Sequence, residues 1–155
     1  MKGNDKIIAL LNDFLADELT AISQYMVHSE MCDSWGYDKL HKSIEKRAID
    51  EMKHAEKLIG RIIALEGTPV VSKLNKMSIG ADVQSQFKND VAAESVAIEG
   101  YNKGISLCIE LGDNGSRRLI DDNLKDEESH LDWLETQLDQ INQMGLQNYL
   151  QAQSE

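Results

Sequence analysis

Two identical sets of three metal-ligating residues stand 76 positions apart in this chain. Each set is a glutamate followed, 33 positions later, by a Glu-x-x-His motif, and the six residues are Glu18, Glu51, His54, Glu94, Glu127 and His130. The i, i+3 spacing places both side chains of each motif on one face of a helix. Four helices that carry Glu, Glu-x-x-His, Glu and Glu-x-x-His supply the ligands of a di-iron or di-manganese carboxylate site inside a four-helix bundle.

The six residues have the chemistry of a two-metal site. Carboxylates are hard oxygen ligands and imidazoles are borderline nitrogen ligands. Two divalent ions would cancel the charge of the four glutamates, whose burial without metal or protons would be unfavourable. A single glutamate is usually a solvated surface charge, but two matching sets are poorly explained that way. We expect Glu51 and Glu127 to bridge the ions, and each remaining glutamate to share an ion with the histidine of its own set: Glu18 with His54, and Glu94 with His130.

Two further pairs of residues follow the same offset of 76: Tyr25 with Tyr101, and Asp50 with Asp126. Each aspartate directly precedes a Glu-x-x-His motif, and metal-bound histidines usually donate their second nitrogen to a carboxylate. We therefore expect Asp50 and Asp126 to orient the histidines across the site. Each tyrosine comes two helical turns after the first glutamate of its set. It can either hydrogen-bond a ligand carboxylate or pack in the core with a satisfied hydroxyl.

Met52 lies within one Glu-x-x-His motif but cannot share the inward face of that motif, because successive helix residues are rotated by about 100°. We expect its thioether to point outward or sideways. There it can line a contact between subunits or ligate a haem iron. The position of Met52 alone favours the subunit contact.

The composition limits the classes of protein and partner. A chain of 155 residues suits one domain, residues 1–155, and 5% aromatic residues with a single proline favour helices. A net charge of −11 counts against a nucleic-acid partner. No apolar run of about eighteen residues and no signal-like segment is seen, so we expect a cytoplasmic protein with no membrane partner. Cys32 and Cys108 form no Cys-x-x-Cys motif and should be reduced and packed on helices.

Apolar residues recur at helical spacing in four long segments, and a short fifth segment follows. Gly36 should end the first helix, Asp38 and Asp82 should cap the second and third, and Gly145 should separate the last two. The connection at about 66–81 is long enough to run the length of a bundle. The expected helices cover about 5–34, 39–65, 83–111, 116–144 and 146–152.

These lengths predict an all-α fold, a ferritin-like four-helix bundle with one long crossover and a short fifth C-terminal helix. Short turns make the first and second helices antiparallel, and likewise the third and fourth. Apolar residues on the outer faces of the first two helices predict a large homo-oligomer; they are Met31, Trp35, Met52 and Ile59. The fifth helix, with Leu146, Tyr149 and Leu150, is too short to be stable alone and should need partner subunits.

Over nearly its whole length the chain resembles the bacterioferritins, the haem-containing branch of the ferritin-like proteins. The segments that carry the resemblance are the opening Met-Lys-Gly, Asp-Glu-Met-Lys-His-Ala at 50–55, Leu-Glu-Gly-x-Pro at 65–69, Asp-Glu-Glu-Ser-His-Leu-Asp-Trp-Leu-Glu-Thr-Gln-Leu at 126–138, and Met-Gly-Leu-Gln-Asn-Tyr-Leu at 144–150. The resemblance implies a hollow 24-mer, twenty-four subunits with a ferroxidase site in each and a ferric mineral inside. It also implies haem b between two subunits, held by Met52 of each, which passes electrons that release stored iron as Fe(II).

Several positions depart from the family's pattern. An inner-surface iron site of many relatives uses a histidine where this chain has Lys46, which counts against an inner electron-feeding iron here. Thr68 replaces a common leucine in the loop where a ferredoxin partner docks in some relatives. The resemblance also leaves open assembly with a second bacterioferritin subunit type. Near a pore, Glu30 and Ser34 differ from many relatives, whereas the positions that match are Glu66, Asp132 and Thr136.

The leading interpretation is an iron store whose ferroxidase oxidises Fe(II) with dioxygen or peroxide. A rubrerythrin-like, peroxide-reducing di-iron protein usually adds a Cys₄ site, for which two cysteines are insufficient. An acidic surface and a ligand set inside one subunit count against a DNA-coating mini-ferritin. A haem-binding electron-transfer oligomer with a structural metal site is the remaining alternative, and iron uptake would separate it from a store.

Overall fold

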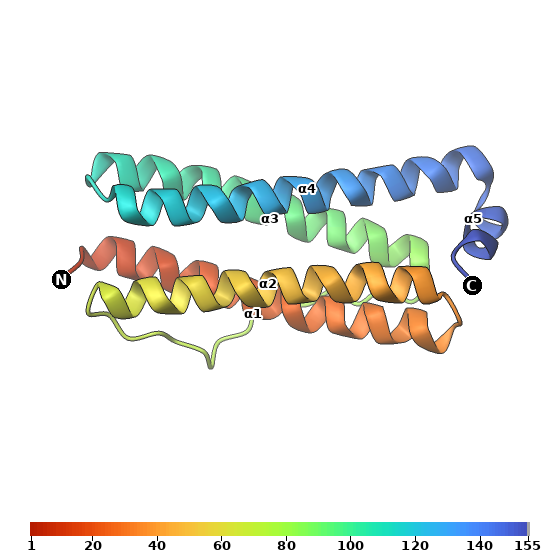
Figure 1. The fold of residues 1–155 in the computed structure, drawn as a ribbon, viewed down its shortest axis with the longest axis horizontal. Coiled ribbons are helices and arrows are strands. Elements are labelled where there is room, and N and C mark those ends of the chain that lie inside the picture. Colours follow the sequence, from red (N-terminus) through yellow and green to blue (C-terminus); the bar gives the residue numbers. More distant parts are fainter. Residues whose placement is uncertain (155) are drawn as a thin grey trace.

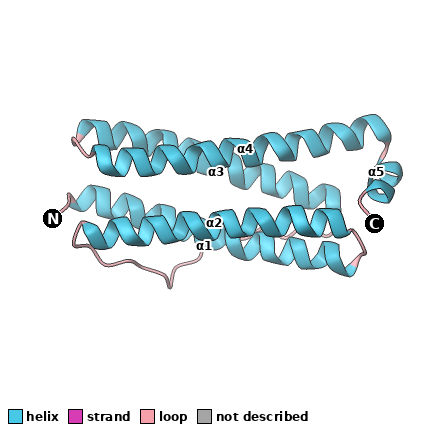
Figure 2. Ribbon diagram, viewed as in Figure 1, coloured by secondary structure: helices cyan, strands magenta, loops and turns pink. Residues whose placement is uncertain are grey.

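The computed structural model describes residues 1–154, which form five α-helices and no β-strand. In Figures 1 and 2 the long helices lie along a common axis, and the short C-terminal helix lies across one end. The predicted all-α fold is thus confirmed. The helices are α1 (Asp5–Ser34), α2 (Asp38–Ala64), α3 (Val83–Glu110), α4 (Asn114–Met144) and α5 (Leu146–Ala152).

The four long helices form two antiparallel hairpins, α1 with α2 and α3 with α4. Contacts of α1 with α3, and of α2 with α4, join the hairpins. The crossover, residues 65–82, returns along the outside of the bundle before α3 begins, so α2 and α3 run in the same direction (Figure 1). This is the one-crossover topology that the length of the connection predicts.

Side chains at the helix starts explain most of the boundaries. Asp82 accepts a hydrogen bond from the backbone N–H of Ser85 at 2.8 Å and completes a capping box, as predicted. The predicted cap at Asp38 is wrong, because Tyr37 occupies that position without a side-chain hydrogen bond and Asp38 is already helical. There its negative charge still favours the helix start. Helix α4 begins two residues earlier than expected, at Asn114, because Asp113 caps it.

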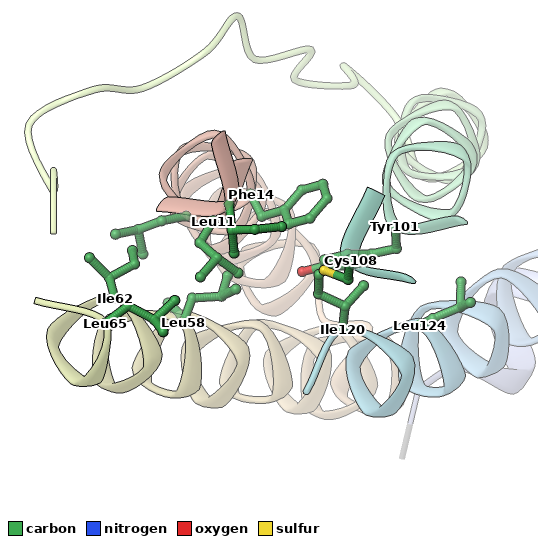
Figure 3. Close-up of a cluster of buried hydrophobic side chains, with 12 residues drawn as sticks. Leu11, Phe14, Leu58, Ile62, Leu65, Tyr101, Cys108, Ile120 and Leu124 are labelled. Carbon is green, nitrogen blue, oxygen red and sulfur yellow. The ribbon is translucent and has the colours of Figure 1, made fainter. Parts of the chain in front are cut away.

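Two apolar clusters fill the bundle, one toward each end. In the first, side chains from all four long helices converge, including Leu11, Leu58, Cys108 and Ile120 (Figure 3). The second lies around Ile44, Phe87, Leu134 and Tyr149, among others. The midpoints of the four helices lie between the two clusters, where the expected ligands fall. The apolar clusters therefore hold the helices in register on either side of a polar centre.

Helix α5 packs on its own bundle through Tyr149, while Leu146 at its start stays 38% exposed. Tyr149 is fully buried, and its hydroxyl donates a hydrogen bond to Gln137 Oε1 at 2.6 Å. Its ring meets Phe87 edge-on, with 6.3 Å between centroids. The N–H of Lys39 also donates to the carbonyl of Gln153 at 3.1 Å, which ties the end of the chain to α2.

Cys32 and Cys108 are buried free thiols on α1 and α3, so they pack as expected. Within residues 1–154, no helix combines the length and the apolar character that crossing a bilayer requires.

Candidate metal centre

The six repeated residues meet at the centre of the bundle, and none is more than 6% exposed. Helices α1 and α3 each bring one glutamate, and α2 and α4 each bring a Glu-x-x-His pair. Their ligand atoms form two overlapping groups, in each of which all atoms lie within 4.8 Å of one another. Glu51 and Glu127 belong to both groups. Glu18 and His54 complete one, and Glu94 and His130 complete the other.

Each histidine is oriented by the aspartate from the opposite motif. His54 Nε2 lies 2.8 Å from Asp126 Oδ2, and His130 Nε2 lies 3.0 Å from Asp50 Oδ2. A histidine that donates its Nε2 proton to a carboxylate leaves the Nδ1 lone pair free. In both residues Nδ1 faces the glutamates, so each imidazole in its neutral form would present the Nδ1 lone pair to a metal ion at the centre. Asp50 and Asp126 thus lie where the repeat places them.

Each tyrosine reaches across the bundle to the carboxylate of the other half. Tyr25 donates a hydrogen bond to Glu94 Oε1 at 2.5 Å, and Tyr101 donates one to Glu18 Oε1. Both phenols are fully buried, and burial followed by the charge of the neighbouring glutamate raises each tyrosine pKa well above its usual value. The phenols therefore stay protonated and act as donors. Of the two alternatives left open by the sequence, the hydrogen bond to a ligand carboxylate is the one observed.

Every one of the six residues keeps one buried polar atom with no hydrogen-bond partner outside the six. These atoms are Glu18 Oε2, Glu51 Oε1, His54 Nδ1, Glu94 Oε2, Glu127 Oε1 and His130 Nδ1. Within the six, His54 Nδ1 lies 2.9 Å from Glu127 Oε1, and His130 Nδ1 lies 2.9 Å from Glu51 Oε1. Buried polar atoms are rarely left unpaired in proteins, because the loss of solvation is unfavourable. Four carboxylate oxygens and two imidazole nitrogens converging in one place have the donor chemistry that iron and manganese accept. The residues present therefore fit two metal ions.

Burial and the closely spaced carboxylates of the centre shift the pKa values of its residues. Burial, and then the charge of Glu18, raise the pKa of Glu51 well above its usual value. Burial, and then Glu51 and Glu18, do the same to the pKa of Glu127. Burial alone would lower the pKa of His54, but the surrounding carboxylates, Glu127 first, raise it strongly. The raised pKa values of these three residues favour bound protons at the centre when no metal ion is present.

Comparison with known proteins supports an assignment to a family. The ferritin-like domain matches residues 8–144. The bacterioferritin of Brucella melitensis is 42% identical over 149 residues, which cover 96% of this chain and 92% of that protein. The bacterioferritin of Rhodobacter capsulatus is 40% identical, and that of Mycolicibacterium paratuberculosis 38%, each over 96% of this chain and over 92% and 94% of the respective relatives. The chain belongs to the bacterioferritin family. Its departures from the family at Lys46 and Thr68 are therefore differences within a family and do not count against membership.

Lys46 lies on the surface beside the centre of this bacterioferritin-family chain. Its side chain is 79% exposed, and Nζ is 3.7 Å from Asp50 Oδ2, the same oxygen that faces His130. Position 46 thus carries an exposed cation, which still counts against an inner-surface metal ligand there.

Met52 is half exposed on the outside of α2, away from the centre, as the helical rotation predicts. It lines a groove of about 340 Å³ between α1 and α2 whose other apolar walls are Ile22, Met26, Ala48 and Ile49. Met26 and Ile49 are also exposed, at 54% and 41%. Trp35 is 38% exposed, whereas Ile59, expected on an outer face, packs against the core.

A second cavity, of about 270 Å³, lies between α1, α3 and the crossover. Its lining includes Glu18, Glu51 and Glu127, together with Asn75 and Ser78 of the crossover. Three of the six glutamate and histidine residues of the centre therefore border a cavity large enough for water. The acidic character of that lining suits a small hydrated cation.

A buried polar cluster beside Tyr25 was not found from the sequence: Gln24, His28, Arg47 and Asp90 are each no more than 4% exposed. Arg47 precedes Glu51 by four positions, and Asp90 precedes Glu94 by four, so each lies one turn from a ligand on the same helix face. That spacing is the signal that could have identified them. A search confined to the repeated residues missed them because none of the four has a counterpart of the same type 76 positions away.

Proposed function

We propose that this protein oxidises Fe(II) at the six-residue centre and stores the resulting Fe(III) in the interior of a shell. The observation that carries this proposal is the set of six buried ligand atoms with no partner outside the set, divided into two groups that share Glu51 and Glu127. The bacterioferritins to which the chain is similar support the same function.

The chain's own residues account for binding two Fe(II) ions side by side. Glu51 and Glu127 bridge them, and two-metal sites of this kind hold their ions ~3.5–4 Å apart. Glu18 with His54 and Glu94 with His130 complete the two positions. Two Fe(II) together supply two electrons. With uptake of two protons, these reduce one dioxygen to hydrogen peroxide, or one hydrogen peroxide to two waters. The buried tyrosines hold the terminal carboxylates in place throughout.

Storage needs an enclosed space, so the proposal includes a homo-oligomeric shell of twenty-four subunits. Support comes from the apolar residues that one subunit leaves exposed along α1 and α2, among them Met26, Ile49 and Met52. Contiguous exposed apolar surface on a helical protein is typical of subunit contacts. A second bacterioferritin subunit type would join the shell through the same exposed apolar surface.

We also propose that haem b binds at the groove beside Met52, between two subunits. A thioether at the rim of an apolar groove can meet its equivalent from a second copy across a twofold axis. Haem held by two neutral sulfurs would be an electron carrier that favours the ferrous state relative to histidine ligation. It would accept electrons from a partner such as a ferredoxin and pass them to stored Fe(III).

The test is iron loading of the purified metal-free protein under air. A store takes up many more than about two Fe per subunit and keeps them soluble. A haem-binding electron-transfer oligomer stops at about two. A rubrerythrin-like protein would consume peroxide faster than it accumulates iron. Uptake that stops at two, or precipitation of all added iron, would contradict storage.

A further inference from the structure

The two metal positions of the proposed centre have the same ligands but different surroundings. The six ligands and their aspartate and tyrosine partners follow the offset of 76, so equal surroundings would make two equal sites. Four positions near Tyr25 break the repeat: Gln24, His28, Arg47 and Asp90 correspond to Gly100, Gly104, Asn123 and Phe14. One half of the centre is therefore lined by polar and charged side chains where the other half has small, neutral or aromatic ones.

The polar half brings a permanent cation next to Glu94. Arg47 Nη2 is 3.5 Å from Glu94 Oε1, and Nη1 is 3.4 Å from Asp90 Oδ2. The guanidinium carbon lies 4.2 Å above the ring of Tyr25. A guanidinium keeps its charge inside a protein. Arg47 is 4% exposed, so solvent screens this charge little.

The remaining members of the cluster hold Asp90 and do not add a second cation. His28 Nε2 accepts a hydrogen bond from the N–H of Gly80 at 3.0 Å, so the proton of a neutral ring is on Nδ1, which lies 3.0 Å from Asp90 Oδ1. Gln24 Nε2 donates to the same oxygen at 2.8 Å. Asp90 balances part of the Arg47 charge. Of the four residues in the cluster, however, Arg47 is the one that lies beside Glu94.

The other half carries no such charge at the matching place. Phe14 packs on Tyr101, with 4.6 Å between ring centroids, and Asn123 Nδ2 lies 3.5 Å from the Tyr101 hydroxyl. The two halves also differ in access. The cavity beside the crossover reaches Glu18 and both shared glutamates, and within residues 1–154 its lining does not include Glu94 or His130.

We propose that Arg47 makes the two positions unequal, so that a divalent metal ion fills the Glu18–His54 position first and the Glu94–His130 position second and more weakly. This inference rests on the proposed two-metal centre. A second ion must bind beside a buried cation that already occupies one side of Glu94. Charges within ~4–6 Å shift a protonation equilibrium by ~1–3 pKa units, or ~10- to 1,000-fold. Since Asp90 offsets part of the charge, we expect the second ion to bind ~10-fold more weakly than the first.

The test is an anaerobic titration of the metal-free protein with Co(II), followed by the visible absorption of the bound ion. The wild-type protein should give two steps of about one Co(II) per subunit each, with affinities about tenfold apart. The double variant Arg47→Gln with Asp90→Asn removes both buried charges and keeps the side-chain shapes, and its two steps should merge as the second tightens about tenfold. Arg47→Lys keeps the charge and should keep two steps. Arg61→Gln, which removes a distant arginine paired with Asp113, should behave as the wild type.

A second measurement does not depend on any variant folding. A crystal grown with one Co(II) per subunit should show anomalous scattering mainly at the Glu18–His54 position. Equal occupancy of both positions, or an unchanged ratio of affinities in the double variant, would overturn the role of Arg47 and leave the two-metal centre standing. Failure of the wild-type protein to bind two Co(II) per subunit would overturn the centre and this inference together.

Discussion

Loading the metal-free protein with two divalent ions should release about four protons per subunit. The centre contains four glutamates and two histidines, all buried. Without metal, a buried site of this kind approaches neutrality when two glutamates are protonated and both histidines carry a positive charge. The raised pKa values of Glu51, Glu127, His54 and His130 have the direction that this state requires. With two ions bound, all four glutamates must be ionised and both histidines neutral, because only those forms are ligands.

The affinity of the centre for metal ions should depend steeply on pH. Protons are bound in the free state and lost on loading, so the combined affinity for two ions rises with pH. Each proton displaced contributes ~1.36 kcal/mol per pH unit. Four protons give ~5 kcal/mol per pH unit in the combined binding free energy of the two ions.

The assay is calorimetric titration with Zn(II), performed in two buffers whose ionisation enthalpies differ. The difference between the observed heats gives the number of protons released. Removing the metal with a chelator at the same pH should take up the same number. The Met52→Leu variant, altered outside the centre, should match the wild type. Release of one proton or fewer per two ions would refute this account of the charge at the centre.

Three further expectations are open to direct measurement. Glu94→Ala or His54→Ala should abolish the rapid phase of Fe(II) oxidation without changing the mass of the assembly. Glu99→Ala, at an exposed position on the same helix as Glu94, should leave the rate unchanged. An unaltered rate in the first two variants would exclude Glu94 and His54 as ligands. Tyr149→Phe should lower the free energy of unfolding by ~1–2 kcal/mol, because it leaves a buried amide without its partner, and an unchanged denaturation midpoint would show that the hydrogen bond is dispensable. Met52→Leu protein loaded with haem should lose the wild-type Soret and low-spin bands, and retention of those bands would exclude this methionine as the axial ligand.

The fold could be predicted because its determinants are local. Helical spacing, the Asp82 cap and the glycines at the turns act over a few residues, and the length of the crossover leaves few topologies. The error at Asp38 has the same origin, since several polar residues near a turn can start a helix and small energy differences decide among them. The anchoring of α5 was not predicted because it depends on Tyr149 meeting Phe87 and Gln137, residues distant in the sequence.

The arrangement of the centre could be predicted for a different reason, which also explains what was missed. A duplicated pattern allows each half to confirm the other, so Asp50 and Tyr25 were identified through their counterparts. Residues that make the halves different are invisible to that comparison. Arg47 and Asp90 could be identified only from the structure, in which both are buried and Arg47 lies beside Glu94. In a duplicated site the shared residues indicate the common chemistry, whereas buried charges that break the repeat decide whether the two positions perform it equally. The most informative next comparison in this chain is therefore between Arg47 and Asn123.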